Sequence, residues 1–251
     1  MAAEEYVQSL ARGLDVLRAF DAAHPRQTLS EVAASTGLSR ATARRFLLTL
    51  VELGYLRTDG KQFSLTPRVL ELGYSYLSAL TLPELAQPHL EQLSATVHES
   101  TSASVLDGTD IVYVARVPVR RIMAVTIGIG TRFPASATSM GRVMLAGLDA
   151  AELPRHLAAE LPVFTQRTLA SREALAEELD RVRAQGWALV DGELEPGLRS
   201  LATPIRDRSG AVIAAINVAG RAEGDPAAFV ERLLPALRTA TAAIESDLPA
   251  A

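Results

Sequence analysis

Hydrophobic residues follow helical spacing in the first eighty residues of the chain and strand-like spacing after residue 100. Val7, Leu10, Leu14 and Leu17 recur at helical intervals, with charged residues between them. This pattern predicts an amphipathic helix over residues 7–21, with one face turned toward a core.

Two further helices are predicted, with a tight turn between them. Thr28 and Glu31 form a T-x-x-E capping box at the start of the first helix, and Gly37 ends it. Ser39 caps the second helix, which runs to Gly54. This spacing is typical of a helix-turn-helix, and a generic helical hairpin is the alternative.

The sizes of the residues in this helix pair favour the helix-turn-helix. Ala33 is small where the two helices must cross, and Leu38 is placed to fill the turn. Ala43, Leu47 and Leu50 share one face and should point inward. The opposite face carries arginines near the start of the second helix, the end that contacts bases when such a helix lies in the major groove.

Residues 55–66 are predicted to form a hairpin around the Asp59-Gly60 turn, which completes a winged helix-turn-helix. Lys61 at the tip and Arg57 on the strand would hold phosphates, which position a protein on DNA without reading its sequence. A solvated turn lysine is the alternative for Lys61. The residues predicted to contact DNA are Thr28, Ser39, Arg40, Ala41, Thr42, Arg44, Arg45, Arg57 and Lys61.

Residues 67–80 are predicted to form a helix with Leu70, Tyr74 and Leu77 in one stripe. This stripe would either mediate dimerisation or pack onto its own domain. Pro83 is expected to interrupt the chain before the next helical segment.

The rest of the chain predicts a sheet bracketed by helices. Two strands should meet at Asp107-Gly108, and acidic Asp191, Glu193 and Glu195 are interpreted as a solvated loop. The other predicted elements are strands at 122–129, 187–190, 200–207 and 211–220, and helices at 138–148, 171–186 (capped by Ser171 and ended by Gly186) and 226–246. This order indicates an α+β fold with an antiparallel-rich sheet, typical of a sensor domain.

Charge and composition narrow the function. The 251 residues carry a net charge of −4, yet residues 39–68 hold six basic and two acidic side chains, as expected of a surface that meets a polyanion. No apolar run reaches the roughly 18 residues of a membrane span, and the N-terminal stretch lacks a secretory pattern. We therefore expect a cytoplasmic protein that binds double-stranded DNA and no membrane.

The chain shows no motif for catalysis. It has no cysteine, its four histidines are scattered, and neither a nucleophile elbow nor a phosphate-binding loop is found. We expect no enzyme activity, no cofactor and no metal; an enzyme acting on small acids is the alternative. Binding is favoured instead, because the first amides of the 138–148 helix, near Ser139 and Met140, could hold an anion. Arg121 and Arg132 could clamp a carboxylate there.

The chain resembles the IclR-type transcriptional regulators over nearly its whole length. The resemblance rests on SLARGLDVLRAF, LSEVAASTGLSRATARRFLLTLVELGYL, FPASATSMGRVMLA and GWALVDGELEPGLRSLATPIRDRSGAVIAAINVA. The stretch TRFPASATSMGRVMLA is most similar to the branch that governs the catabolism of aromatic acids, namely protocatechuate, para-hydroxybenzoate and the β-ketoadipate pathway.

The resemblance implies a ligand-responsive regulator of a catabolic operon, a homodimer or homotetramer that senses a small carboxylic acid. It implies a winged helix-turn-helix domain (1–66), a linker helix (67–81) and a GAF-like effector domain (82–251). A constitutive regulator whose C-terminal domain only oligomerises is the alternative. Met140, which replaces a smaller residue, favours a longer or aromatic acid. Carried over by position, the pocket comprises Ile122, Val125, Ser139, Met140, Leu198, Ser200, Asn217 and Ala219.

Overall fold

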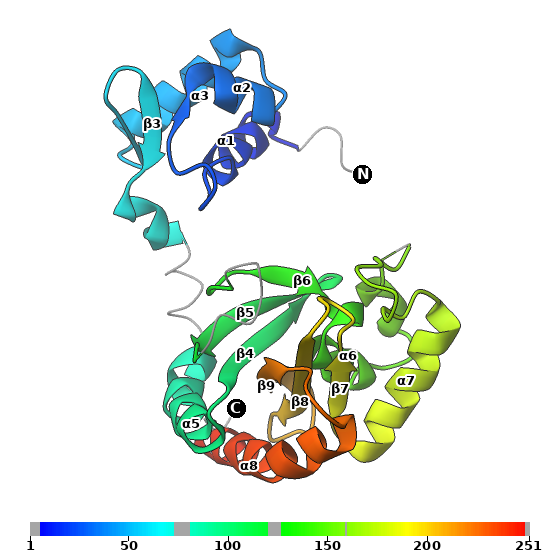
Figure 1. The fold of residues 1–251 in the computed structure, drawn as a ribbon. Helices are drawn as coiled ribbons and strands as arrows, with labels where there is room; N and C mark the ends of the chain where they lie inside the picture. The colour runs from blue at the N-terminus through cyan, green and yellow to red at the C-terminus, as the bar shows by residue number, and fades with distance from the viewer. Residues whose placement is uncertain (1–5, 73–80, 120–126, 159, 249–251) are drawn as a thin grey trace. The chain divides into compact units, whose positions relative to one another are not determined.

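A computed structural model describes residues 6–72, 81–119, 127–158 and 160–248. The chain divides into two compact units, Met1–Ala79 and Leu80–Ala251 (Figure 1). The boundary between the units falls inside the predicted linker. Among the described residues, no helix combines the length and the apolar character that crossing a membrane requires.

In its described residues, the first unit combines helices with a three-stranded antiparallel sheet in the order β1-β3-β2. Its elements are α1 (Gln8–Arg18), β1 (Gln27–Thr28), α2 (Leu29–Ser35), α3 (Arg40–Glu52), β2 (Leu56–Thr58), β3 (Gln62–Leu65) and the 3-10 turn η1 (Pro67–Val69). The helix-turn-helix and the hairpin are therefore both present. The two-residue strand β1, which pairs with β3, is too short to give a periodic signal.

Local signals in the sequence account for the helix-turn-helix geometry. Thr28 and Glu31 form the expected capping box, and the Ser39 hydroxyl accepts a hydrogen bond from the Thr42 amide. Gly37 has a φ of +66°, a conformation that side chains other than glycine rarely adopt. The inward-facing residues are also as predicted: Ala33, Ala43, Leu47 and Leu50 are buried, and Leu38 is half-buried.

The buried face of α1 differs from the prediction. Val7, Leu10 and Leu14 are exposed, whereas Val16 and Phe20 enter the core. The segment carries apolar residues on two sides, so its periodicity located the helix but could not show which side would meet α3 and the sheet.

The second unit is built on a six-stranded antiparallel sheet with the strand order β6-β5-β4-β9-β8-β7. Its helices are α5 (Thr81–Val97), α6 (Ser139–Ala146), α7 (Arg172–Gln185) and α8 (Pro226–Asp247). Its strands are β4 (Ser100–Asp107), β5 (Asp110–Val117), β6 (Arg132–Pro134), β7 (Ala188–Asp191), β8 (Leu198–Arg206) and β9 (Val212–Arg221). The 3-10 turns η2 (Ala135–Ala137) and η3 (Leu153–His156) lie before and after α6.

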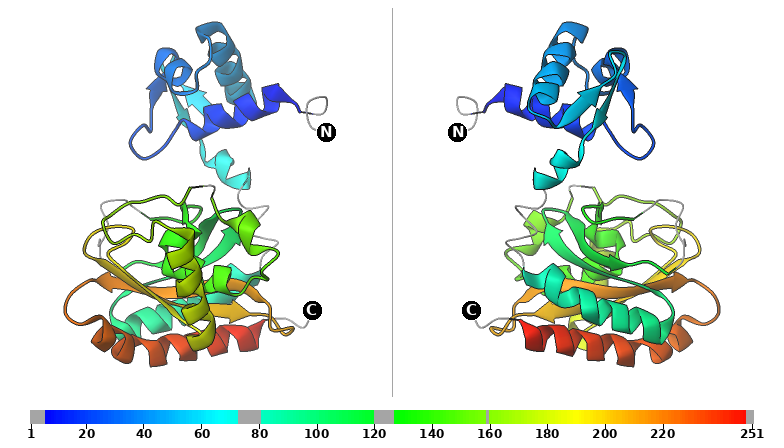
Figure 2. Two further views of the ribbon diagram at one scale, coloured as in Figure 1. Left: turned by 90° about the vertical axis from the view of Figure 1, so that its right-hand side faces the viewer. Right: turned by 90° about the vertical axis from the view of Figure 1, so that its left-hand side faces the viewer.

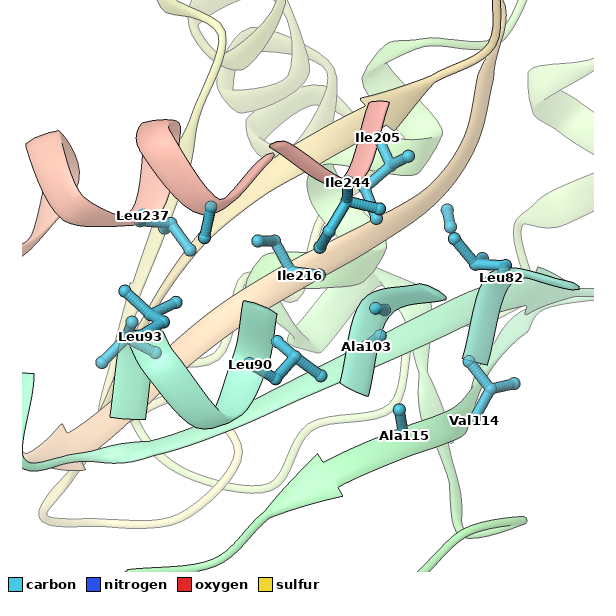
Figure 3. Close-up of a cluster of buried hydrophobic side chains, with 14 of the residues drawn as sticks. Leu82, Leu90, Leu93, Ala103, Val114, Ala115, Ile205, Ile216, Leu237 and Ile244 are labelled. Carbon is cyan, nitrogen blue, oxygen red and sulfur yellow. The ribbon is translucent and has the colours of Figure 1, made fainter. Parts of the chain in front are cut away.

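The helices cover the two faces of this sheet separately (Figures 1 and 2). Helices α5 and α8 pack on one face, where Leu90, Leu237 and Ile244 meet Ile205 and Ile216 (Figure 3). Helices α6 and α7 pack on the other face through a second buried cluster. Successive side chains of a strand point to opposite faces of the sheet. Each side chain therefore points either toward α5 and α8 or toward α6 and α7.

Three predictions for this unit need correction or lie outside the described residues. Residues 127–129 of the predicted strand 122–129 form no strand, and 122–126 lie outside the described residues. The strand that pairs with the outer side of β5, opposite β4, is β6. Of the predicted helix 67–80, residues 67–72 form η1 and the start of a helix, and 73–80 are not described. Pro83 does not interrupt the chain but lies in the first turn of α5. A backbone N–H has no hydrogen-bond partner within the helix at this position, so proline is tolerated there.

Candidate functional site

The first candidate surface is the outer face of α3. Arg40, Arg44 and Arg45 are exposed, as are Ser39 and Ala41, and Thr42 is half-buried. Within the described part of the chain, none of the three arginines forms an ion pair. Three uncompensated guanidinium groups near the start of one helix suit contact with phosphates and with guanine edges.

The hydroxyl residues predicted to contact DNA are already engaged in holding the helix starts. Ser39 Oγ lies 2.8 Å from Thr42 Oγ1 and accepts from the Thr42 amide at 3.2 Å. Thr28 Oγ1 donates to Glu31 Oε2 at 2.8 Å. These side chains therefore position α2 and α3.

The hairpin presents its basic residues from an ordered turn. Asp59 Oδ1 accepts hydrogen bonds from the amides of Gln62 (2.8 Å) and Lys61 (2.9 Å), and these bonds hold the pKa of Asp59 below its ordinary value. Arg57 Nε donates to Ser64 Oγ at 3.1 Å on the neighbouring strand. Arg57 and Lys61 are both exposed. The turn thus holds two cations on the surface of the same unit as the α3 arginines.

The second candidate site is a cavity between the sheet and the N-terminal turn of α6. It encloses about 570 Å³ of space that no atom occupies, part of it open to solvent. Six predicted residues line it: Ser139, Met140, Leu198, Ser200, Asn217 and Ala219. Residues that the sequence did not indicate also line it, among them Ser100, Tyr113, Arg116, Ile127 and Leu194.

Buried hydroxyl groups make one wall of this cavity polar. Ser139 Oγ lies 2.6 Å from Ser200 Oγ, and Asn217 Nδ2 donates to Ser200 Oγ at 2.8 Å. On β4 the alternating residues Ser100 and Ser102 are buried with them. The sequence signal for this wall is the serine at every second position of STSAS, which places hydroxyls on one face of the strand.

Arg116 on β5 is the cation of the cavity. Its Nη1 donates to Ser102 Oγ at 3.1 Å, and its buried Nε has no hydrogen-bond partner among the described residues. The side chain is half-buried, and this desolvation lowers the pKa of the guanidinium. A guanidinium without a carboxylate partner, facing a cavity, is suited to bind an anion.

Arg132, which was predicted to clamp the effector, has a different role. Its Nη1 lies 2.6 Å from Asp107 Oδ2 and its Nε 3.2 Å from Asp110 Oδ2. The hydrogen bond with Asp107 is the main cause that raises the pKa of Arg132. Because β6 pairs with the start of β5, its first residue meets the acids of the β4–β5 turn rather than the cavity. Arg121, Ile122 and Val125 lie outside the described residues.

The acidic segment at residues 191–195 is not a solvated loop. Glu193 is 8% exposed and its carboxylate pairs with Arg142 of α6, which is 1% exposed. Asp191 pairs with Arg199 and Arg167, and the hydrogen bond from Arg199 is the main cause that lowers the pKa of Asp191. The segment is thereby tied to α6, and its Leu194 forms part of the cavity wall.

Comparisons with known proteins match both units. Residues 9–60 match the family model "IclR helix-turn-helix domain", and residues 74–246 match "Bacterial transcriptional regulator IclR C-terminal". The chain is 46% identical over 216 residues to the Pca regulon regulatory protein of Pseudomonas putida (85% of this chain, 74% of that protein). It is 38% identical over 247 residues to the p-hydroxybenzoate hydroxylase transcriptional activator of Acinetobacter baylyi (94% and 89%).

Solved structures match nearly the whole length of the chain. A protein of Rhodococcus sp. RHA1 has a TM-score of 0.85 and 58% identity, covering 97% of this chain and 98% of that one. An IclR homolog from Microbacterium hydrocarbonoxydans, complexed with 4-hydroxybenzoate, has a TM-score of 0.85 and 29% identity, covering 96% and 99%.

Proposed function

Because this chain belongs to the IclR family of bacterial transcriptional regulators, we propose that it controls an operon for aromatic-acid catabolism in response to a small carboxylic acid. The relatives named above, a Pca regulon regulator and a p-hydroxybenzoate hydroxylase activator, support this pathway. The observation that carries the proposal is Arg116, a half-buried guanidinium in the cavity with no carboxylate beside it among the described residues. The effector's carboxylate would supply the missing partner.

The proposed macromolecular partner is double-stranded operator DNA, which places the protein in the bacterial cytoplasm. Arg44 and Arg45 would read base edges in the major groove, while Arg40, Arg57 and Lys61 would hold phosphates. In this role Thr28, Ser39 and Thr42 keep the helices in place and Ala41 allows close approach.

The proposed assembly is a homodimer or homotetramer. Regulators with this motif commonly place two recognition helices about 34 Å apart on DNA, one from each copy. The exposed side chains of Leu10 and Leu14 on α1, and of Val7 just before it, support contact with a second copy, since apolar side chains grouped on a surface often belong to an interface.

The effector would act through the populations of two arrangements of the assembly. A ligand that binds one arrangement more tightly shifts the equilibrium toward it, and operator affinity changes by the same coupling free energy. The cavity lies between α6 and the sheet, so an effector there would contact both.

Thermal unfolding of the purified chain with carboxylic acids tests the proposal. An acid at 100 times its dissociation constant should stabilise the protein by about 2.7 kcal/mol. Arg116→Met should remove this stabilisation, whereas the matched control Arg132→Met, which breaks an exposed ion pair, should retain it. Equal stabilisation of both variants would refute the role of Arg116. A flat response to every acid would favour a constitutive regulator.

A further inference from the structure

Two arginines lie on the outer face of the β1-β3-β2 sheet, on either side of Ser64. Arg57 on β2 is among the residues that the sequence predicts to contact DNA, whereas Arg26, directly before β1, carries no such signal. Both arginines line the same two surface hollows, together with Gln62 and Ser64. Taking the proposed DNA binding as given, we infer that Arg26 and Arg57 clamp one backbone phosphate of the duplex between them. The interface with DNA then extends from the tip of the hairpin across the face of its sheet.

The register of the sheet brings the two arginines into one row. Arg57 on β2 is paired with Ser64 on β3. On the other side of β3, Gln27 of β1 is paired with Phe63. The strands are antiparallel, so the next position in this register sets Arg26 opposite Ser64. The Cα atoms of Arg26 and Arg57 are therefore two strand spacings apart, about 10 Å, and two long side chains at this separation can reach one anion from opposite sides.

This face of the sheet is turned away from the core. Phe63 packs in the core of the first unit, so Ser64, its neighbour along β3, points to the other face. Arg26 and Arg57 are both exposed. Arg57 Nε donates to Ser64 Oγ at 3.1 Å, which directs the guanidinium toward the middle of the row. Its two terminal nitrogens have no partner among the described residues, and they are the donors that a phosphate accepts from.

The charges around the hollows favour an anion. Neither arginine forms an ion pair with another described residue. Two carboxylates also line the hollows, but each one holds a turn: Asp59 Oδ1 accepts from two amides of the hairpin turn, and Asp21 Oδ1 accepts from the His24 amide at 2.6 Å. Those turn amides are the main cause that lowers the pKa of Asp59, and the charge of Arg26 adds to it. The positive charge of Arg26 therefore acts within the hollow.

The position of Arg26 in the fold favours a phosphate of DNA over a free anion. In a helix-turn-helix, the first helix crosses the DNA backbone while the second lies in the major groove. Arg26 lies two residues before Thr28, which caps α2, the first helix of the motif. Because both arginines are exposed, salt screens their attraction for a free ion. A duplex already bound through α3 instead presents its phosphates at a high effective concentration.

Fluorescence anisotropy of the full chain with a duplex of arbitrary sequence tests the inference, because phosphate contacts carry no sequence information. Arg26→Gln should weaken binding about tenfold at low salt for each copy on the DNA, through the loss of charge-assisted hydrogen bonds. It should also reduce the slope of log affinity against log salt concentration by about 1 for each copy. Arg26→Lys keeps the charge and should retain most of that slope.

Arg208→Gln is the matched control. It removes the same charge from an exposed position in the turn between β8 and β9, in the second unit, where no contact with DNA is proposed. We expect both the affinity and the salt slope of this variant to equal those of the wild-type chain.

A double-variant cycle tests whether the two arginines share one phosphate. Arg57→Gln alone should weaken binding about as much as Arg26→Gln. The double variant should lose clearly less than the product of the two single losses, because the second substitution removes a contact that the first has already broken. Losses that multiply would show two separate contacts, and the shared clamp would then be wrong.

The outcomes separate this inference from the proposed function. If the wild-type chain binds the duplex and Arg26→Gln binds it equally well, the clamp is refuted while DNA binding through α3 stands. If Arg26→Gln abolishes calorimetric binding of inorganic phosphate but leaves DNA binding unchanged, the hollow takes a free anion and the inference fails. No binding of any duplex by the wild-type chain would overturn both.

Discussion

The ion pair between Arg142 and Glu193 allows a quantitative test of how the effector domain holds its cavity together. Arg142 Nη1 and Nη2 donate to the two carboxylate oxygens of Glu193 at 2.9 and 2.5 Å, and Arg142 Nε donates to Ser136 O at 3.0 Å. Glu193 also accepts from the Leu169 amide at 3.3 Å. The pair joins α6 to the segment that carries Leu194, two parts of the chain that both line the cavity.

Glu193→Ala should lower the free energy of unfolding by about 3–5 kcal/mol, because it leaves the Arg142 charge buried without its bidentate partner. The remaining carboxylate near Arg142, that of Glu178, is 3.8 Å away and too distant for a good hydrogen bond. The double variant Arg142→Met with Glu193→Leu should recover most of the loss, since apolar residues of similar volume remove the desolvated charges together.

Urea unfolding, monitored by tryptophan fluorescence, measures this effect in the second structural unit, which contains the ion pair. The chain has one tryptophan, Trp187, which packs against the core of the second unit. Asp180→Ala is the matched control: it removes a carboxylate 2.6 Å from Arg183 on the exposed side of α7, with 77% of the Asp180 side chain exposed. It should change stability by less than about 1 kcal/mol. A loss for Glu193→Ala no larger than that of the control would refute the reasoning.

Three further predictions concern other parts of the chain. Arg44→Ala should weaken operator binding by about 1–3 kcal/mol and relax specificity at one base pair, whereas Lys61→Ala should weaken binding to all sequences alike, both measured by fluorescence anisotropy. Burial raises the pKa of Tyr113 from 10.0 to about 12. The stability that the neutral Tyr113 side chain contributes is therefore complete below pH 10 and is lost as the pH rises toward 12. In an alkaline titration, Tyr113→Phe should lose less stability than wild type between these pH values. Gly141→Ala would drive its new Cβ into the backbone of Ala135, and calorimetry should show a melting temperature well below that of wild type. An unchanged melting temperature would contradict the close approach.

Much of the first unit could be predicted from the sequence because its signals are local. A capping box, a glycine at a left-handed turn and an apolar stripe each act within one or two turns of helix, and Thr28, Gly37 and Leu47 behave in the structure as the pattern indicated. The Asp59-Gly60 hairpin belongs to the same class of short-range signal. The outward position of Arg44 and Arg45 then follows from helical geometry alone.

The positions of the charged residues around the cavity required the tertiary structure. The sequence alone does not distinguish the surroundings of Arg116, Arg121 and Arg132. The pairing of β5 with β4 and β6 directs Arg116 into the cavity and Arg132 toward two aspartates. Glu193 looked like a loop carboxylate because its partner lies 51 residues away.

Local patterns in the sequence were therefore enough to locate most of the helices and strands and the arginine face of α3, but not the short strands β1 and β6. The tertiary structure decided which side of α1 is buried, which arginine faces the cavity and which carboxylate is desolvated. The physical reason is range: hydrogen bonds and side-chain spacing within a helix or a tight turn are encoded by neighbouring residues, whereas burial and ion pairing depend on strands and helices brought together from distant parts of the chain.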